Sequence, residues 1–442
     1  MRTRRRTAPR INIVTLGCSK NRVDSENLLT QLQASALDAR HESTEAAEVV
    51  VVNTCGFIDK AKQESIDTIL HYAAAKTAGD IEKLYVTGCL SERYRDELTA
   101  EMPEVDAFFG TLELPALVAR LGADYKHHLL GERIPTTARH YAYLKIAEGC
   151  NRPCGFCAIP LMRGGHVSRP IEALVDEAHW LVSRGVKELL LIAQELTFYG
   201  QDLYGRRRLA DLLHALAEVD GLRWIRLHYA YPAGFPLDVI DAMAAHPNIC
   251  RYLDLPLQHA ADNVLQRMRR GITRAKTEDL LATLRARLPG IALRTTLLVG
   301  YPGETEADHQ ELLSFIERMQ FDRLGVFTYS HEEGTHAGKT YPDDVPEATK
   351  QARAEEVMAL QHDISLAHNQ RRIGQILPVV IDRQEGRQWV GRTEYDSPEV
   401  DGEVYVTSPE PLTVGAFYPV RITGAEPYDL IGEVTQTTPL AG

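Results

Sequence analysis

Apolar and polar positions alternate along the first third of the chain in a way that predicts strands separated by helices. Apolar, strand-like runs fall at residues 11–16, 48–53, 83–87 and 105–109. Helical stretches lie near residues 22–36, 59–76, 91–99 and 113–121. Strands that alternate with helices predict a parallel sheet covered by helices. We therefore expect an N-terminal α/β domain over residues 8–125.

The middle of the chain repeats a strand followed by a helix about six times. The predicted strands lie near residues 141–147, 188–194, 224–230, 252–258, 291–299 and 323–329. The predicted helices lie near residues 171–184, 207–218, 236–246, 261–270, 274–288 and 304–319. Such a repeat predicts a partial (β/α)6 TIM-like barrel over residues 136–365, with its site at the carboxyl ends of the strands.

The last part of the chain has a third pattern. A charged helical stretch, residues 346–372, is followed by short alternating runs between residues 376 and 434 that glycines interrupt at near-regular spacing. Regular turn signals and β-branched residues predict a small antiparallel barrel of about five strands. We place this third domain at residues 371–440, so the fold class is α/β with a C-terminal all-β domain.

Composition limits where the protein could act and which partners it could bind. The chain has 442 residues, of which 44% are hydrophobic, and no run of 18 apolar residues that could cross a membrane. The basic arm Met1–Arg6 lacks the apolar stretch of an export signal, and we interpret it as a solvated tail. A net charge of −12 argues against a broad nucleic-acid-binding surface. We expect a cytoplasmic protein with reduced cysteines and no membrane partner.

Three of the seven cysteines, Cys150, Cys154 and Cys157, share one short loop with the spacing C-x3-C-x2-C after the strand at 141–147. Three thiolates on a 4Fe–4S cluster leave one iron open to bind a substrate molecule. This spacing is typical of radical S-adenosylmethionine (SAM) enzymes. The alternative is zinc, but the nearest histidine, His166, follows nine residues after the last cysteine, outside the usual spacings. Buried structural thiols are a further alternative, but they need no fixed spacing.

Three other cysteines, Cys18, Cys55 and Cys89, each follow a predicted strand of the first domain. Open α/β sheets bind ligands at the carboxyl edge of their strands. The equivalent placement indicates a second cluster site, the alternative being three unrelated core thiols. The seventh cysteine, Cys250, precedes the apolar strand predicted at 252–258 and is interpreted as structural.

Four segments carry a resemblance to a known family: LGCSKNRVDSE from Leu16, NTCGFIDKAKQESI from Asn53, TGCL from Thr87 and RGGHVSRP from Arg163. Together with the three-domain layout, they resemble the methylthiotransferases among radical SAM enzymes, whose third domain is called TRAM. The first two segments are similar to the members that modify small-subunit ribosomal protein S-twelve. The resemblance covers nearly the whole chain except the basic arm.

The resemblance implies addition of a methylthio group to the β-carbon of an aspartate in that ribosomal protein. It implies two 4Fe–4S clusters, one on Cys150, Cys154 and Cys157 and an auxiliary one on the N-terminal cysteines, together with SAM and an electron donor such as flavodoxin or ferredoxin. No side chain is expected to act as a catalytic acid or base, because the clusters and SAM carry the chemistry. Two alternatives stay open. One is a tRNA adenosine methylthiotransferase, and the other is a non-enzymatic iron–sulfur scaffold or redox protein.

The residues that contact SAM are predicted from polar positions at barrel strands, a glycine-containing loop from Gly300 and an aromatic residue between two cysteines. Each could equally be a hydrogen-bonded core or loop residue. The candidates are Phe156, Gln194, Gln258, Arg294, Gly300, Gly303 and Glu304.

Residues 371–442 hold 11 acidic and 6 basic residues, a charge of −5 (6 − 11) that suits a basic ribosomal protein better than RNA. We therefore expect docking through this acidic region. Reversing Glu394, Asp396, Glu399 and Asp401 to lysine should weaken it.

Overall fold

The computed structural model describes residues 9–440, and the basic arm Met1–Arg6 lies outside the described residues. The chain forms two compact units. One contains the residues up to Thr137 together with the segments 148–151 and 158–167, and the other contains the rest of the chain. The barrel and the C-terminal β domain therefore belong to a single compact unit.

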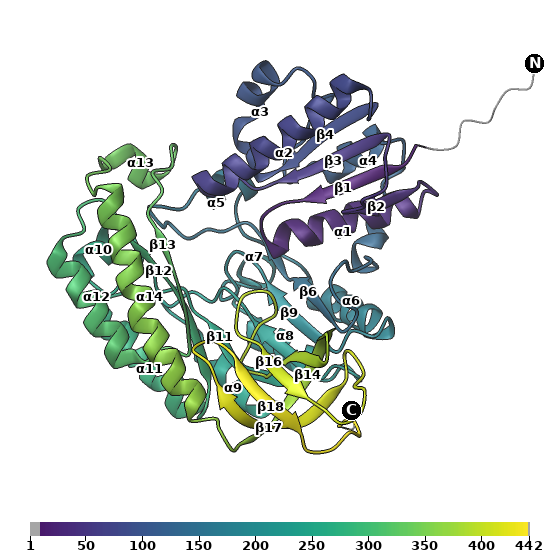
Figure 1. Cartoon of the computed structure of the whole chain (residues 1–442). Helices are drawn as coiled ribbons and strands as arrows, with labels where there is room; N and C mark the ends of the chain where they lie inside the picture. The colour runs from purple at the N-terminus through teal and green to yellow at the C-terminus, as the bar shows by residue number, and fades with distance from the viewer. Residues whose placement is uncertain (1–8, 441–442) are drawn as a thin grey trace, which may run out of the picture. The chain divides into compact units, whose positions relative to one another are not determined.

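A five-stranded parallel sheet forms the centre of the first unit, with the strand order β2-β1-β3-β4-β5 (Figure 1). Its strands are β1 (Ile11–Thr15), β2 (Ala39–His41), β3 (Val49–Thr54), β4 (Lys83–Gly88) and β5 (Ala107–Phe108). Its helices are α1 (Ser19–Gln33), α2 (Asp59–Ala78), α3 (Cys89–Glu101), α4 (Leu114–Arg120) and a 3-10 turn (His127–Gly131). The prediction missed β2, which has three residues, two of them the polar Arg40 and His41.

Helices cover both faces of this sheet because β3 is apolar on both sides. Val49 and Val51 pack into one core, whereas Val50 and Val52 pack into the other. Successive side chains of a strand point to opposite faces, so a continuous run of valines requires a cover on each side.

A six-stranded parallel sheet with the order β13-β12-β11-β10-β9-β6 forms the partial barrel of the second unit (Figure 1). Its strands are β6 (Tyr141–Lys145), β9 (Glu188–Ile192), β10 (Trp224–Leu227), β11 (Ile249–Asp254), β12 (Ala292–Val299) and β13 (Arg323–Thr328). Its longer helices are α6 (Ile171–Ser183), α8 (Leu209–Ala217), α9 (Leu237–Ala245), α10 (Asp262–Arg267), α11 (Arg274–Arg287), α12 (Glu306–Met319) and α14 (Glu347–Gln370). Shorter elements are β7 (Ala147–Glu148), α5 (Ile159–Arg163), β8 (Val167–Ser168), α7 (Gln201–Tyr204) and α13 (His336–Thr340).

The structure confirms the predicted fold class, but the boundaries of one barrel strand differ from the prediction. The sequence pattern placed the fourth barrel strand at 252–258, but β11 ends at Asp254, shortly before Pro256, which has no backbone N–H to donate to a sheet. Cys250 therefore lies inside the strand, where it is buried.

The C-terminal domain is a closed five-stranded barrel with the order β14-β15-β16-β18-β17. Its strands are β14 (Ile376–Glu385), β15 (Gln388–Arg392), β16 (Val404–Thr407), β17 (Phe417–Ala425) and β18 (Leu430–Val434). The structure confirms the predicted small antiparallel barrel, with one exception: β16 and β18 pair in parallel. A closed ring with an odd number of strands cannot alternate in direction all the way round, so one neighbouring pair must be parallel.

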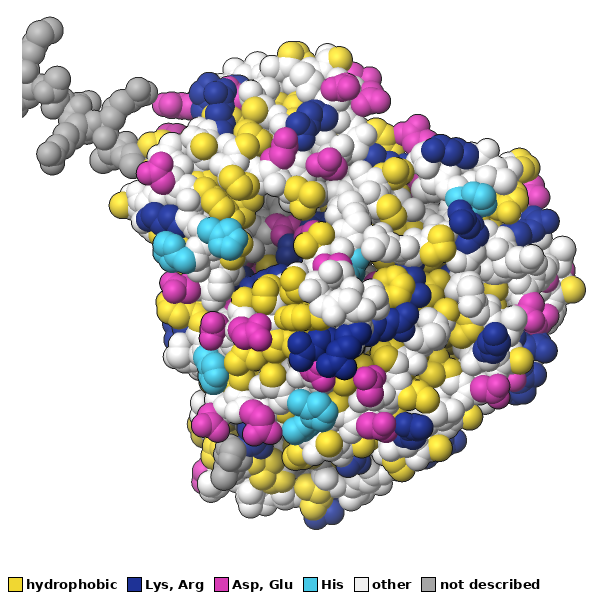
Figure 2. All heavy atoms as spheres, turned by 180° about the vertical axis from the view of Figure 1, so that it is seen from behind, with side chains coloured by type: hydrophobic (Ala, Val, Ile, Leu, Met, Phe, Trp, Pro, Cys, Tyr) yellow, Lys and Arg dark blue, Asp and Glu magenta, His cyan; other side chains and the backbone are white. Residues whose placement is uncertain are grey.

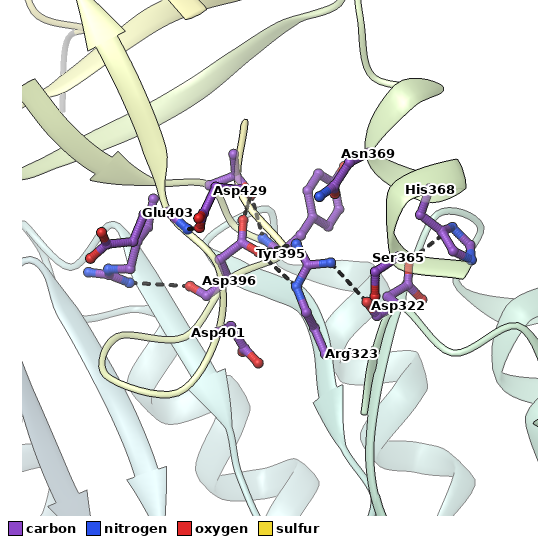
Figure 3. A network of polar contacts seen from close by, with 12 residues as sticks. Asp322, Arg323, Ser365, His368, Asn369, Tyr395, Asp396, Asp401, Glu403 and Asp429 are labelled. Atoms are coloured by element: carbon purple, nitrogen blue, oxygen red, sulfur yellow. Dashed lines mark hydrogen bonds and ion pairs between the residues drawn. The ribbon is translucent and has the colours of Figure 1, made fainter. Parts of the chain in front are cut away.

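The loop between β15 and β16 packs against the barrel through buried charges. Asp396 accepts hydrogen bonds from Arg323, which begins β13, with an Nε–Oδ1 distance of 3.1 Å (Figure 3). Asp401 accepts from the Tyr252 hydroxyl at 2.7 Å and from Arg294 Nε at 3.2 Å. These partners lie in β11, β12 and β13, and both arginines sit near the amino ends of their strands. The C-terminal domain therefore caps the end of the barrel opposite the cysteine loop.

These contacts correct the docking variant that the sequence suggested. Asp396 is buried, Asp401 is held as described above, and Glu399 accepts hydrogen bonds from two tyrosine hydroxyls of β6. Glu394 accepts from the backbone N–H of Arg251 at 3.2 Å. Reversing these four charges would break the contact between the two domains, so that variant cannot report on a partner.

Charge on the surface is mixed. Figure 2 shows Asp and Glu side chains interspersed with Lys and Arg over the face that it displays, with one compact group of basic side chains. Over residues 9–440, no helix is both long enough and apolar enough to cross a membrane.

Candidate functional site

The sheet of the first unit brings Cys18, Cys55 and Cys89 to one edge. Cys18 caps α1 soon after β1, Cys55 directly follows β3, and Cys89 begins α3 directly after β4. Since β1, β3 and β4 are neighbouring parallel strands, their carboxyl ends meet at the same edge. A Cβ atom added to Gly17, where φ is +89°, would lie 2.9 Å from Cys55 Sγ. Only glycine allows this close approach of the two loops.

A buried arginine organises the polar groups at this edge. Arg163 donates to Asn21 Oδ1 at 2.5 Å, and Asn21 in turn donates to the backbone carbonyls of Leu16 and Thr54. The same guanidinium pairs with Asp24 at 2.9 Å and with Glu148 at 3.0 Å. Its positive charge is therefore matched by carboxylates next to the cysteines.

The thiols of this set influence one another. Burial raises the pKa of the Cys55 thiol to about 12, and the neighbouring Cys18 and Cys89 contribute to the rise. Burial also raises the pKa of Cys89, while the charge of Arg163 opposes that rise. Three thiols at one edge with a guanidinium beside them fit an iron–sulfur cluster, which binds thiolates. No group of three His, Cys, Asp or Glu side chains that could hold a single metal ion occurs in residues 9–440.

The second set follows β6 on one loop. The backbone N–H of Cys150 donates to the Gly164 carbonyl at 3.1 Å, and that of Cys157 donates to the Cys154 carbonyl at 3.2 Å. Gly149 approaches the backbone so closely that a Cβ atom there would lie 2.0 Å from the Gly165 carbonyl oxygen. The glycines that flank the loop therefore permit its fold, and all three cysteines are partly exposed.

Cys154 contacts a buried arginine and a tyrosine. Arg270 Nη1 lies 3.2 Å from Cys154 Sγ, and Arg270 Nη2 donates to the Pro256 carbonyl at 2.5 Å. The Tyr231 hydroxyl lies 3.8 Å from the same sulfur and donates to the Arg270 carbonyl at 2.7 Å. The guanidinium also stacks over the Tyr231 ring, 4.3 Å from its centroid.

Arg152, inside the cysteine loop, also packs over the Tyr231 ring. Its guanidinium carbon lies 3.9 Å from the Tyr231 centroid and 3.7 Å from the Phe198 centroid. Its charge is matched by Glu195 at 3.1 Å. This stack fixes the loop to the strand ends without using the cysteine thiols.

Comparison with known proteins identifies the family. Residues 10–110 match a family described as the uncharacterised protein family UPF0004, residues 144–316 match the Radical SAM superfamily, and residues 373–435 match the TRAM domain. The ribosomal protein uS12 methylthiotransferase RimO of Flavobacterium johnsoniae is 58% identical over 98% of this chain and 100% of its own length. The RimO of Cytophaga hutchinsonii is 57% identical over 97% of this chain and 98% of its own length.

The chain belongs to the RimO family of radical SAM methylthiotransferases.

Solved structures show the same fold at low identity. TsrM, a radical SAM methyltransferase from Kitasatospora setae, has a TM-score of 0.53 at 14% identity over 72% of each chain. OxsB, a cobalamin-dependent SAM radical enzyme, has a TM-score of 0.52 at 13% identity over 80% of this chain and 56% of its own. The superfamily match implies SAM and a 4Fe–4S cluster as cofactors.

Most of the SAM-contact candidates of this radical SAM chain lie near the carboxyl ends of barrel strands. Gln194 follows β9, Gln258 follows β11, and Gly300 directly follows β12. Gln258 has φ of +77°, a strained value for a residue with a side chain, and its carbonyl accepts from Leu298 N at 2.7 Å. Phe156 packs in an apolar cluster with residues that include Tyr301. These residues stay candidates for contacts with SAM.

Two candidates have other uses in the structure. Glu304 is buried and pairs with Arg353 of α14 at 3.0 Å, so it joins the loop after β12 to that helix. Arg294 lies near the amino end of β12, where it pairs with Asp254 at 3.0 Å and with Asp401. Gly303 has φ of +75°, and its Cα lies against the guanidinium of Arg267. The side chains of Glu304 and Arg294 are therefore engaged in ion pairs within the protein.

Sequence reasoning missed the charged residues that contact the cysteines. Arg163 lies in the segment RGGHVSRP, whereas Arg270 and Tyr231 lie in none of the segments that resemble the family. Tyr231 and Arg270 are 77 and 116 residues from Cys154, respectively, so no local spacing could have linked them. The only sequence signal for these two residues was that Tyr231 follows strand β10 and Arg270 follows helix α10.

Proposed function

We propose that this chain methylthiolates an aspartate β-carbon of ribosomal protein uS12, with a SAM-binding 4Fe–4S cluster on Cys150, Cys154 and Cys157 and an auxiliary cluster on Cys18, Cys55 and Cys89. The observation that carries the proposal is the presence of two separate sets of three cysteines, one at each ligand-binding edge. The name of its relatives, uS12 methylthiotransferase, supports the substrate.

When bound, the clusters and SAM supply the radical chemistry needed to functionalise an unactivated C–H bond, which no protein side chain can deprotonate. The chain's own residues hold and orient them. Each set offers three thiolates and thereby leaves one iron open to an exogenous ligand. Arg163 keeps the carboxylates of Asp24 and Glu148 neutralised beside the N-terminal set. The apolar cluster around Phe156 and Tyr301 limits water near the loop.

The C-terminal domain supports a protein substrate rather than RNA. Residues 371–442 carry an acidic excess, and phosphate-backbone binding requires basic surface. Since Asp396, Glu399 and Asp401 are engaged with the barrel, docking of a basic protein must use the exposed acids. Glu385 is exposed but pairs with Arg383, which leaves the exposed Glu410, Glu426 and Glu433.

The test compares the two substrates in one experiment. We would delete the gene, complement it with the wild-type chain or with Cys150→Ala, and analyse uS12 and tRNA by mass spectrometry. We expect the methylthio group on the uS12 aspartate to disappear on deletion and to return with the wild-type chain only. If only tRNA lost its methylthio group, the tRNA methylthiotransferase assignment would replace this one. If neither changed while the iron stayed bound, the chain would be a scaffold.

A further inference from the structure

Arg270 differs from every other buried arginine in the described part of the chain. Seven arginines are buried there: Arg133, Arg163, Arg226, Arg270, Arg323, Arg353 and Arg392. Six of them pair with a carboxylate of this chain. Arg270 is 4% exposed, yet within residues 9–440 it has no carboxylate partner and its Nε has no hydrogen-bond partner.

A buried guanidinium needs a counter-charge. Arginine stays protonated in proteins, and an unpaired charge in a low-dielectric interior is strongly unfavourable. The contacts of Arg270 are the Pro256 carbonyl, the Tyr231 ring and Cys154 Sγ at 3.2 Å. A carbonyl dipole and an aromatic face supply partial compensation only. Among these partners, only the Cys154 sulfur would carry a negative charge as the thiolate ligand of a cluster.

We propose that Arg270 is the built-in counter-charge of the cluster held by the loop cysteines, and that it raises the reduction potential of that cluster through Cys154. This inference rests on the proposed function, because it requires a 4Fe–4S cluster on Cys150, Cys154 and Cys157. Reduction transfers one electron from an external low-potential donor to the bound cluster, which becomes more negative by one charge. A fixed positive charge next to a ligating sulfur stabilises that reduced state.

Tyr231 is a positioning residue that holds Arg270 next to Cys154. Its hydroxyl donates to the Arg270 carbonyl at 2.7 Å, and its ring contacts the guanidinium groups of both Arg270 and Arg152. Arg152 is paired with Glu195, so it adds no unmatched charge. The arrangement holds the guanidinium of Arg270 against the sulfur.

The experiment measures the midpoint potential of the cluster by a redox titration followed with electron paramagnetic resonance. The parent is the full chain with Cys18, Cys55 and Cys89 replaced by alanine, so that a single cluster gives the signal, and dithionite is the reductant. In Arg270→Ala we expect the equilibrium constant for one-electron reduction to fall about tenfold, a shift of about −59 mV. Tyr231→Phe should shift it in the same direction by less.

Two controls separate charge from structure. Arg269→Ala removes the same charge from an exposed neighbouring residue and should leave the potential unchanged. Arg270→Lys keeps the charge and should recover most of the shift. If Arg270→Ala takes up no cluster, Arg270→Gln is compared with Arg270→Lys. A lower potential in the glutamine variant supports the proposal, and equal potentials overturn it.

The outcomes also separate this inference from the proposed function. An iron content and a signal that do not depend on Cys150, Cys154 and Cys157 would refute the cluster assignment itself. An intact cluster with the parent's potential in Arg270→Ala would overturn the counter-charge alone. If that variant kept the potential but bound SAM more weakly, Arg270 would be assigned to the SAM carboxylate instead.

Discussion

The two sets of cysteines each have a buried arginine beside a thiol, but the two arginines are compensated differently. Next to the N-terminal set, Arg163 pairs with Asp24 and Glu148, so its charge is matched within the chain. Next to the loop set, Arg270 has no carboxylate partner among the described residues. The first site is electrostatically balanced before any cofactor binds, whereas the second has no carboxylate of the described chain to balance it, and we propose that the cluster ligated by Cys154 does so.

The two sets also differ in how they are built. Cys18, Cys55 and Cys89 come from three neighbouring strands and meet only when the sheet has formed. Cys150, Cys154 and Cys157 lie within eight residues of one loop, so covalent connection alone keeps them close. A mutation that loosens the sheet should therefore affect the first site before the second.

The largest expected effect comes from removing each set in turn. Alanine at Cys150, Cys154 and Cys157 should leave about half of the iron and abolish 5′-deoxyadenosine formation from SAM. Alanine at the three N-terminal cysteines should also leave about half of the iron but spare 5′-deoxyadenosine formation. Iron analysis and chromatography of the nucleoside measure both. A full iron content in the second variant would contradict the auxiliary cluster site.

The next largest effect is expected from replacing Arg163, whose charge is matched by carboxylates. Arg163→Ala removes the buried guanidinium that pairs with the half-buried Asp24 and Glu148, which should reduce local stability by about 1.5–3 kcal/mol for each lost charged hydrogen bond. Hydrogen exchange of the α1 amides measures this change in the apo protein. Adding Asp24→Asn and Glu148→Gln to Arg163→Ala should restore most of the protection. A triple variant as unprotected as the single one would show that Arg163 acts by packing instead of charge.

A third buried arginine, Arg323 at the start of β13, allows the contribution of an ion pair to stability to be measured. Asp396→Asn removes the anionic partner of Arg323 and should destabilise the contact between barrel and C-terminal domain by about 1.5–3 kcal/mol. Although burial opposes it, Arg323 and the Thr393 hydroxyl hold the pKa of Asp396 below its ordinary value.

This lowered pKa predicts the pH dependence of the third effect. A group with a lowered folded-state pKa stabilises the fold at pH values above its unfolded pKa, about 3.9 for Asp, and loses that contribution as pH falls through the folded value. The stability difference between wild type and Asp396→Asn should therefore be constant at neutral pH and shrink below about pH 4. Chemical denaturation at several pH values measures it, and a difference that grew in acid would contradict the assignment.

The smallest effect is expected from charges that are exposed. Replacing Glu410, Glu426 and Glu433 by lysine should leave the fold and SAM cleavage intact and weaken binding of uS12 by about 0.2–1 kcal/mol per residue. Binding should also weaken as salt rises, since exposed charges are screened over about 8–10 Å. Titration calorimetry at two salt concentrations measures both. If neither the charge reversal nor the salt concentration changed the affinity, uS12 would bind at another surface.

Local pattern was enough to predict the alternating strands, the partial barrel and the five-stranded domain. Each depends on a short period along the chain, such as the valines of β3, which face both sides of their sheet. The same holds for the loop cysteines, because their spacing is covalent. The boundary of β11 was wrong because the apolar run 252–258 contains Pro256, whose effect the pattern did not register.

Only the tertiary structure decided which charges are matched. Asp396 and Arg323 lie 73 residues apart and Cys154 and Arg270 lie 116 apart, and nothing in their neighbours in sequence pairs them. The sequence therefore counted Asp396 and Asp401 as docking acids and Arg294 as a cofactor contact, when all three hold the C-terminal domain on the barrel. A charge needs a partner once packing removes the water around it. Burial depends on contacts between segments far apart in sequence, which a local sequence pattern cannot predict.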